Sequence, residues 1–326
     1  MPNVPPGPRP FRFGVLAAGA VDAQGWRRTA RLVESLGYSS LLFPDHQDKD
    51  WGPLVSLAVA AEHTSHLRLG TLMLAAGLRS VPLLYKEMAT LDIVSGGRTE
   101  VGLGAGWYVQ DYLRAGVKMA PPRERIDLLE ESAEVFTRLW EESAASLRGR
   151  HLQIDGAVGR PQPVQDKAPL TIGGGGERVL GVAARHASII NIGAVLSSGG
   201  KDTRFGASAT ADRFDERVRL IRELTAACVS PPELQCLAFA AAVTEQRDRY
   251  ARRVLSPMFG LPPEEALESP LAVVGSVEQI CDTLLERRER FGITYWVIPA
   301  NQAEVFAPVV ARLTSAERSS ALMGVE

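Results

Sequence analysis

The stretch Gly37-Tyr-Ser-Ser-Leu-Leu-Phe-Pro44 decides the fold, because its pattern of a glycine, a short apolar run and a proline returns at Gly292-Ile-Thr-Tyr-Trp-Val-Ile-Pro299. A segment with helical spacing of apolar residues precedes each copy, at 26–36 and at 277–285. Glycine directly after such a segment is typical of a left-handed helix end. The same unit of helix, glycine, strand and proline at both ends of the chain predicts a parallel sheet joined by helical crossovers.

Further units of this kind lie between the two copies. Helices are expected at 53–63, where proline occupies the first turn, and at 125–140, and a capping box of Ser276 and Gln279 begins the helix before Gly292. About eight strands alternating with helices predict the α/β class and a (β/α)8 TIM barrel, and counting strands leaves a doubly wound open sheet as the alternative. The expected strands are 11–16, 39–43, 67–74, 101–103, 170–172, 188–192, 237–243 and 293–298.

The chain is longer than such a barrel needs, since barrels of this type typically have about 250 residues. The surplus predicts loop insertions on the carboxyl-terminal face of the barrel, at 144–165, 193–215 and 245–270. Residues 11–326 are expected to form a single barrel domain, because no stretch between them looks like an interdomain linker. The proline-rich residues 1–10 are expected to form a disordered or extended tail.

The composition restricts the classes of partner. The 326 residues include 36 Lys and Arg against 38 Asp and Glu, for a net charge of −2, and 45% of them are hydrophobic. The high share of hydrophobic residues excludes a disordered chain. The balance of positive and negative charges argues against nucleic acid or an anionic membrane as the main partner. No apolar run approaches the roughly 18 residues of a membrane span. Three cysteines without a C-x-x-C pattern, and an amino terminus without an apolar segment, favour a cytoplasmic location.

Polar residues directly after the expected strands are the candidates for chemistry, because active sites of such barrels lie where the carboxyl ends of the strands emerge. Asp45 and His46 follow the strand at 39–43. His46 is a candidate acid, base or coenzyme contact, with Asp45 as its hydrogen-bond partner. The alternative is a loop-capping carboxylate beside a surface histidine.

Two glycine-rich segments also follow expected strands. Gly102-Leu-Gly-Ala-Gly106 lets the backbone approach another group closely, although its spacing is not that of a dinucleotide-binding fingerprint. Gly173-Gly-Gly-Gly176 leads from a late strand into a helix that begins near Glu177, where free amides and the helix dipole favour a phosphate. A tight turn without a ligand is the alternative. The spacing of histidines, cysteines and carboxylates does not indicate a metal site.

Together these segments resemble the luciferase-like monooxygenase superfamily over about residues 11–313. The helix around 123–130 and the segment Glu268-Ser-Pro are most similar to the subgroup of oxidoreductases that depend on coenzyme F420. The markers of the resemblance are Pro-Asp-His46, Leu67-Arg-Leu-Gly-Thr71, Arg79-Ser-Val-Pro82, Ala89-Thr-Leu-Asp-Ile-Val-Ser-Gly-Gly-Arg98, Gly102-Leu-Gly-Ala-Gly-Trp107, Arg160-Pro-Gln-Pro-Val, Ile172-Gly-Gly-Gly-Gly176 and Val274-Gly-Ser-Val-Glu-Gln-Ile.

The resemblance implies a barrel that binds coenzyme F420, or FMN as the alternative; both are tricyclic rings with a phosphate tail. It places the phosphate on the glycines that precede Glu177, and the ring against a non-prolyl cis peptide bond between Leu72 and Met73. It also implies a homodimer. The coenzyme-binding residues that it implies are Asp45, Leu72, Met73, Ala75, Ala105, Gly106, Gly174, Gly175, Gly176 and Glu177.

Trp107 departs from the pattern of the sugar-phosphate dehydrogenases in this superfamily, which have a glutamate at its position. An indole cannot abstract a proton, so we expect Trp107 to line the substrate pocket. His46 is then the expected catalytic residue, since imidazole exchanges protons near neutral pH. The predicted function is hydride transfer between a bound deazaflavin and a small organic substrate. The alternatives are an FMN-dependent monooxygenase that uses O2 and a separate flavin reductase, and a catalytically silent flavin-binding barrel.

Overall fold

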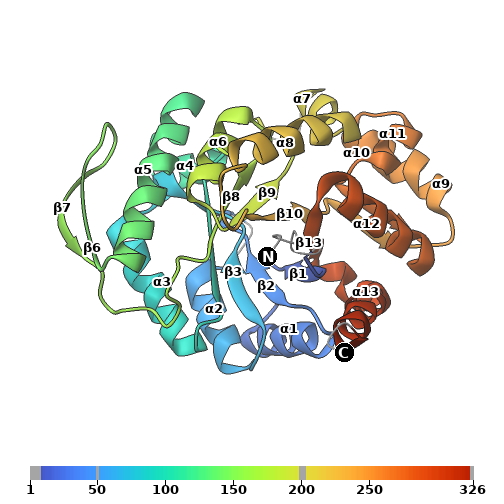
Figure 1. The fold of residues 1–326 in the computed structure, drawn as a ribbon, viewed down its shortest axis with the longest axis horizontal. Coiled ribbons are helices and arrows are strands. Elements are labelled where there is room, and N and C mark those ends of the chain that lie inside the picture. Colours follow the sequence, from blue (N-terminus) through green and yellow to red (C-terminus); the bar gives the residue numbers. More distant parts are fainter. Residues whose placement is uncertain (1–8, 49–50, 198–202, 324–326) are drawn as a thin grey trace, which may run out of the picture.

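Parallel strands pair with one another around a closed ring in the computed structural model of the protein (Figure 1). The pairing of β1 with β13 and of β3 with β5 closes the ring, which confirms the barrel and rules out the open sheet. Among the described residues the eight ring positions are taken, in order, by β1 (Arg12–Leu16), β2 (Ser40–Phe43), β3 (Arg68–Thr71) with its continuation β4 (Leu74–Ala75), β5 (Thr99–Gly104), β8 (Leu170–Gly174), β9 (Ile189–Ile192), β10 (Glu233–Leu237) and β13 (Ile293–Pro299).

The structure describes residues 9–48, 51–197 and 203–323. Most of the tail predicted at 1–10, and residues 198–202 of the insertion predicted at 193–215, lie outside the described residues.

Helices follow the strands and surround the ring (Figure 1). None of the described helices combines the length and the apolar character that a membrane crossing needs. The helices that follow successive ring strands are α1 (Ala23–Ser35), α2 (Pro53–Glu62), α3 (Val81–Ser95), α4 (Val109–Arg114) with α5 (Pro122–Glu141), α6 (Glu177–His186), α7 (Thr203–Ser208) with α8 (Ala211–Leu224), α12 (Val277–Phe291) and α13 (Ala303–Met323).

Local sequence signals set the ends of these helices. Gly37 and Gly292 adopt left-handed backbone angles, with φ of 82° and 74°, as the repeated unit predicted. Ser276 and Gln279 form the expected capping box at the start of α12, and Pro53 is the first residue of α2. These signals act within a few residues, and they are therefore readable without knowledge of the fold.

One expected strand is wrong. The barrel strand is β10, at 233–237, whereas the expected strand at 237–243 covers mainly β11 (Ala240–Val243), which pairs only with β12 (Ala272–Gly275). Glu233 and Gln235 alternate with apolar residues along β10 and are buried against polar partners. Strands of a parallel barrel are expected to be continuous apolar runs, so a segment in which polar and apolar residues alternate is not predicted as one.

The insertions lie on both faces of the barrel. The segment between β9 and α8, and the segment between β10 and α12, follow strand carboxyl ends as predicted. The second of these contains β11, α9 (Arg247–Tyr250), a π-helical turn at Ala251–Leu255, α10 (Ser256–Phe259), α11 (Pro263–Glu268) and β12. The insertion expected at 144–165 is instead a hairpin of β6 (Ala144–Arg148) and β7 (Gln153–Val158) between α5 and β8. It leaves the barrel where α5 ends, at the amino-terminal face, so its predicted position is wrong, and its turn packs back along α5, where Glu131 accepts the Leu152 amide at 2.7 Å.

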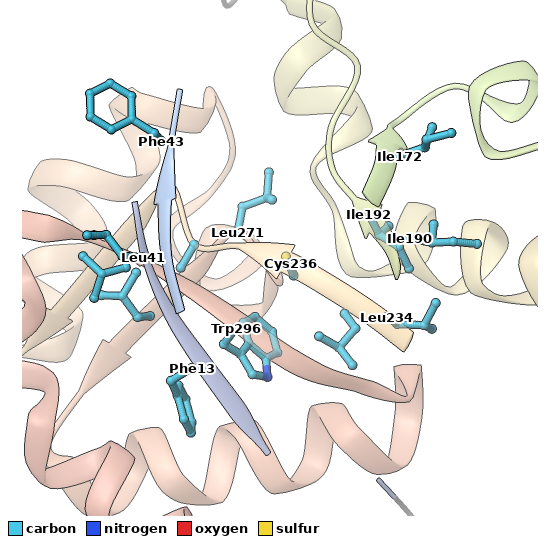
Figure 2. Packing of buried hydrophobic residues seen from close by; sticks show 14 of the residues in the cluster. Phe13, Leu41, Phe43, Ile172, Ile190, Ile192, Leu234, Cys236, Leu271 and Trp296 are labelled. Atoms are coloured by element: carbon cyan, nitrogen blue, oxygen red, sulfur yellow. The ribbon is translucent and has the colours of Figure 1, made fainter. Parts of the chain in front are cut away.

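The core has an outer layer and an inner layer. Phe13, Leu41 and Trp296 project from neighbouring strands into the outer layer between strands and helices, and all three are at most 1% exposed (Figure 2). A smaller apolar cluster that includes Leu42 and Val297 fills the inside of the ring. Successive residues of a strand point alternately into the two layers. The outer layer packs the helices against the strands, and the inner layer fills the barrel beneath its carboxyl-terminal rim.

Glu100 lies inside the ring at the amino ends of the strands and joins four of them. Its carboxylate accepts hydrogen bonds from Arg12, from Arg68 Nε at 2.7 Å and from the Tyr295 hydroxyl at 2.9 Å. Arg12 also pairs with Glu233 at 2.6 Å. Burial raises the pKa of Glu100, but the two guanidiniums outweigh it and leave that pKa below its ordinary value. Burial raises the pKa of Glu233, which Arg12 offsets only in part.

Replacing Glu100 by glutamine is expected to lower the free energy of unfolding by about 3–5 kcal/mol at pH 7, the usual effect of breaking a buried ion pair. A carboxyl group whose pKa is lowered by folding stabilises the fold above its ordinary pKa, and this stabilisation is lost as the pH falls through the folded value. The difference between wild type and E100Q should therefore be complete above pH 4.5 and shrink below it, as measured by urea unfolding across pH.

Glu233→Gln is the matched control. A carboxyl group with a raised pKa stabilises the fold only at low pH and loses this contribution as the pH rises through the folded value. At pH 7 the E233Q variant should therefore change the free energy of unfolding by no more than about 1 kcal/mol. Equal losses in the two variants would show that the guanidiniums do not favour Glu100 over Glu233.

A candidate active site at the carboxyl end of the barrel

Three consecutive ring positions bring most of the predicted site residues together. β2, β3 with β4, and β5 are neighbours, and their carboxyl ends lead into residues 44–46, 72–76 and 105–107. Since the strands are parallel, these segments emerge on the same rim of the barrel. Their side chains and backbone groups contact one another through the bonds described below.

The peptide bond between Leu72 and Met73 is cis, which confirms that prediction of the resemblance. It separates β3 from β4. Leu72 is 8% exposed and belongs to the inner apolar cluster, against which Met73 packs. Gly102 on β5 lies beside this break, and a Cβ atom there would come within 2.1 Å of the Thr71 carbonyl oxygen. The first glycine of the 102–106 segment is thus required by close packing of two strands.

His46 is held by a carboxylate that the sequence analysis did not identify. Its Nδ1 lies 2.9 Å from Oδ2 of Asp111 on α4, and the Gln47 amide donates to Oδ1 of the same carboxylate at 2.9 Å. Because a carboxylate only accepts, the ring carries its proton on Nδ1, and Nε2 is then the basic nitrogen of the neutral imidazole. The Asp111 side chain is 8% exposed and that of His46 is 26% exposed, so the acid anchors the ring from the protein side.

Asp45 has a different partner from the predicted one. Its carboxylate forms two hydrogen bonds with the Arg79 guanidinium, one of them 2.7 Å long, and accepts the Ala75 amide at 3.2 Å. The Asp45 side chain is 2% exposed. The prediction that Asp45 orients His46 is therefore wrong: Asp45 joins the end of β2 to β4 and to the segment that begins α3, and Asp111 orients the histidine.

Aromatic rings surround His46 on the side of β5. The Trp107 ring lies edge-on to the imidazole with its centroid at 5.8 Å, and the Tyr108 ring does the same at 5.8 Å. The two aromatic rings lie 5.2 Å from each other. Trp107 is thus next to the histidine, as a residue that lines a shared site should be, and both rings restrict the positions that the imidazole can adopt.

The segment 104–107 is supported from below by Tyr112 and Arg125. Gly106 has a φ of 71°, and a Cβ atom there would come within 2.3 Å of the Tyr112 hydroxyl. That hydroxyl donates to the Ala105 carbonyl at 3.3 Å, and Arg125 Nε donates to the Gly106 carbonyl at 3.1 Å. Burial raises the pKa of Tyr112, so its hydroxyl remains protonated as a donor. Only glycine fits at 106, and the two carbonyls are fixed in place.

The glycine-rich segment after β8 leads directly into α6. Gly176 is the residue before the helix, no side chain caps it, and a Cβ atom added there would meet nothing within 4 Å. Glu177 is the first helical residue and its side chain is exposed. The amides of the first turn of α6 are thus not covered by a side-chain cap, and the positive end of the helix dipole adds to them.

These glycines do not contact His46. β8 is three ring positions from β2, with β3 and β5 between them, which is about 14 Å along the barrel wall at roughly 4.8 Å per strand. Both segments nevertheless lie on the carboxyl-terminal rim, because every strand of the ring is parallel. Within the described ranges, no group of three or more histidines, cysteines and carboxylates is placed to hold a metal ion.

Asp111 and Arg79 are the site residues that sequence reasoning missed. Asp111 lies four residues after Trp107 on a helix of only six residues, and Arg79 belongs to a segment that was noted only as a marker of the resemblance. Their partners are 65 and 34 residues away in sequence. The sequence did carry a signal for both Asp111 and Arg79. Each follows the end of a strand closely, and a charged side chain that is buried there must find a partner.

Comparisons with known proteins agree with this geometry. A family model described as luciferase-like monooxygenase matches residues 10–295. An uncharacterised protein of Mycobacterium tuberculosis is 28% identical over 263 residues, which cover 73% of this chain and 87% of the relative. The F420-dependent glucose-6-phosphate dehydrogenase of Amycolatopsis mediterranei is 26% identical over 176 residues, which cover 51% of each protein.

Solved structures share the same barrel. The coenzyme F420-dependent tetrahydromethanopterin reductase of Methanopyrus kandleri has a TM-score of 0.73 at 16% identity, with 93% of this chain and 97% of the reductase covered. A riboflavin lyase, solved with a modified FMN and riboflavin, has a TM-score of 0.73 at 16% identity and covers 96% of this chain and 92% of its own. At these identities the likeness shows the fold alone.

Replacing Arg79 by methionine is expected to lower the free energy of unfolding by about 3 kcal/mol, because the buried Asp45 carboxylate then lacks its cation. The double variant Asp45→Leu/Arg79→Met removes both charges and should recover part of this loss. Urea unfolding of the wild type, both single variants and the double variant measures the coupling between the two residues.

The control is Arg114→Met. Arg114 pairs with Asp48 at 2.5 Å, but its side chain is 46% exposed, so its loss should lower the free energy of unfolding by less than about 1 kcal/mol. If the two arginine variants lost the same stability, the burial of the Asp45 and Arg79 pair would have no energetic consequence and its structural role would have to be abandoned.

Proposed function

Because the chain belongs to the luciferase-like monooxygenase family, we propose that it is an oxidoreductase that transfers hydride between bound coenzyme F420 and a small organic substrate. The observation that carries the proposal is the pair of His46 and Asp111 beside Trp107, on the same rim as the uncapped start of α6. Relatives that depend on F420 support the choice of coenzyme. FMN is the alternative, and the homodimer implied by the resemblance remains a prediction.

The residues present on the rim fit a phosphorylated tricyclic coenzyme. The open space at Gly176 and the uncapped first turn of α6 suit a phosphate. The segments that follow β3 and β5 are uncharged here: Leu72 and Ala75 are buried, and the partly exposed Met73, Ala105 and Gly106 offer a surface for a flat ring. Bound there, the deazaflavin would supply the hydride chemistry, and the protein would supply position and proton transfer.

In this proposal His46 moves the proton that accompanies hydride transfer. Asp111 holds Nδ1–H, so that Nε2 accepts a proton from the substrate in oxidation or, when the ring is protonated, returns one in reduction. Gln47 donates its amide to the same carboxylate, which fixes the acid as well as the ring. Asp45 takes no part in proton transfer, because both of its oxygens are engaged by Arg79 and one also accepts the Ala75 amide.

Trp107 limits which reaction of the family this chain can carry out. The resemblance places its indole where the related sugar-phosphate dehydrogenases have a glutamate, and an indole offers no proton acceptor. We therefore assign the proton to His46 alone and give Trp107 the role of a substrate-contacting wall next to the imidazole, 5.8 Å away. A flat or apolar substrate group suits this wall better than a sugar phosphate does.

The first test is a spectral titration of the protein with coenzyme F420 and with FMN under the same conditions. We expect saturable binding of F420 at micromolar or lower concentration and weaker binding of FMN. Tight binding of FMN alone would transfer the proposal to the FMN-dependent monooxygenase. If neither coenzyme bound, the proposed function would be wrong, whereas binding of a flavin without any turnover would support the catalytically silent flavin-binding barrel.

The second test is His46→Ala. General acid–base catalysis contributes about 10²–10⁴ in rate, so kcat should fall by that factor with the substrate found for the wild type in a coenzyme-coupled screen. The dissociation constant for the coenzyme should change by less than about threefold, because the residue acts on the proton. Asp111→Asn should lower kcat by about 10²-fold, since an amide can present a donor to Nδ1 and favour the wrong tautomer.

His151→Ala is the matched control for this test. His151 also lies beside a carboxylate, with Nε2 3.8 Å from Asp127, but it belongs to the hairpin turn that packs along α5 and not to the segments that carry His46, Trp107 and Tyr108. We expect its kcat to equal that of the wild type. Unchanged turnover in His46→Ala, or an equal loss in His151→Ala, would remove His46 from the mechanism.

A further inference from the structure

Arg217 on α8 lies behind the glycine-rich segment that leads into α6. The residue is 7% exposed. Its Nε donates to the Gly175 carbonyl at 2.9 Å, and its Nη1 donates to the Ser208 carbonyl at 2.7 Å. Ser208 Oγ in turn accepts the Val195 amide at 2.8 Å. Arg217 therefore joins the segment after β8 to the loop after β9 and to the end of α7.

Among the described residues, the buried charge of Arg217 has no counter-ion. None of the ion pairs formed by the described residues includes it, and the charges that act on it come mainly from Arg213 and Glu216 on its own helix. Burial lowers its pKa to about 10, which still leaves the guanidinium protonated at neutral pH. Its guanidinium also lies over the Phe214 ring, 5.3 Å from the ring centroid. A buried cation whose hydrogen bonds go to carbonyl groups and not to a carboxylate costs stability and raises the local electrostatic potential.

The backbone geometry directs the effect of this cation outward. In a planar trans peptide the carbonyl and the N–H point in opposite directions. Since the Gly175 carbonyl points at Arg217, the Gly176 amide points away from it. Gly175 itself cannot carry a side chain, because a Cβ atom there would come within 2.4 Å of the Ala194 backbone. The segment therefore presents bare amides on one side and is backed by a cation on the other.

On the basis of the coenzyme proposed above, we propose that Arg217 is a positioning residue that makes the site selective for the phosphorylated over the phosphate-free form of the coenzyme. It orients the Gly176 amide through the Gly175 carbonyl, and its uncompensated charge adds to the positive end of α6. Arg217 does not need to touch the phosphate to do so, because a charge behind a thin backbone layer is poorly screened by solvent.

The experiment compares dissociation constants for two ligand pairs, coenzyme F420 with its phosphate-free deazaflavin riboside, and FMN with riboflavin. In the wild type the phosphorylated member of the pair that binds should be preferred. Arg217→Gln keeps a donor but removes the charge, and the preference should fall about tenfold or more. Arg217→Lys keeps the charge and should stay within about threefold of the wild type. Affinity for the phosphate-free member should be unchanged in both variants.

Arg287 provides the control variant. It is also a buried guanidinium that donates to carbonyls, those of Ala272 and Ser269 among them, but it belongs to α12, and none of its hydrogen bonds to the described residues reaches the segment 173–176. Arg287→Gln should leave the preference for phosphate unchanged. Thermal unfolding of each variant shows whether it is folded, and Arg217→Met replaces Arg217→Gln if the latter is not.

The outcomes separate the two proposals. Wild-type protein that binds none of the four ligands would overturn the proposed function and the role of Arg217 with it. Wild-type protein that prefers the phosphorylated form, together with an Arg217→Gln variant that keeps the same preference, would overturn the role of Arg217 alone. An equal loss of preference in Arg287→Gln would do the same, because the effect would then come from any buried arginine.

Discussion

Parallel pairing of β1 with β13 closes the sheet, and the rest of the molecule depends on this closure. A closed ring of parallel strands sends every carboxyl end to one rim, so segments from residues 45, 105 and 175 are collected there although they are far apart in sequence. Closure also encloses a narrow interior that must be filled. At the amino ends this is done by Glu100 with its partners, and nearer the rim by apolar side chains that include Leu42 and Leu72.

The short helix α4 holds two segments of the rim in place. It supplies Asp111 to the histidine on β2, and its next residue, Tyr112, supports the segment that contains Gly106. One six-residue element thus positions groups on two different strands. Asp45 acts in a similar way from the other direction, since it joins the end of β2 to Ala75 and Arg79. A site of this kind needs only a few side chains that take part in chemistry, because supporting residues fix the positions of those few.

The features that could be predicted from the sequence are those encoded locally or by repetition. Helix ends at Gly37 and Gly292, and the repeated unit around them, were sufficient to predict a barrel, because caps and periodicity act over a few residues. The strand at 233–237 was missed since its inward residues are polar and become acceptable only when Arg12 and Asn191 face them. A need for some partner could be expected of Asp111, but its pairing with His46 could not be predicted, because the two residues are 65 positions apart in sequence. The cis bond at Leu72 and Met73 followed from resemblance and not from any local pattern.

The two sides of the rim differ in charge, and this difference bears on how an elongated ligand would lie. On the side of β2 and β5 the carboxylates are neutralised or engaged, Asp45 by Arg79 and Asp111 by His46, so that this side offers an imidazole and aromatic rings. On the side of β8 and β9 the Arg217 guanidinium, which has no counter-ion in the described part of the chain, lies behind amides that no side chain caps. A ligand with one anionic end and one flat uncharged end can bind across the rim in two orientations. Only one of them places the anionic end on the cationic side and the flat end beside the aromatic rings. For the coenzyme proposed above, the orientation with the reactive ring beside the histidine would therefore be set by the opposite end of the site, about three strands away.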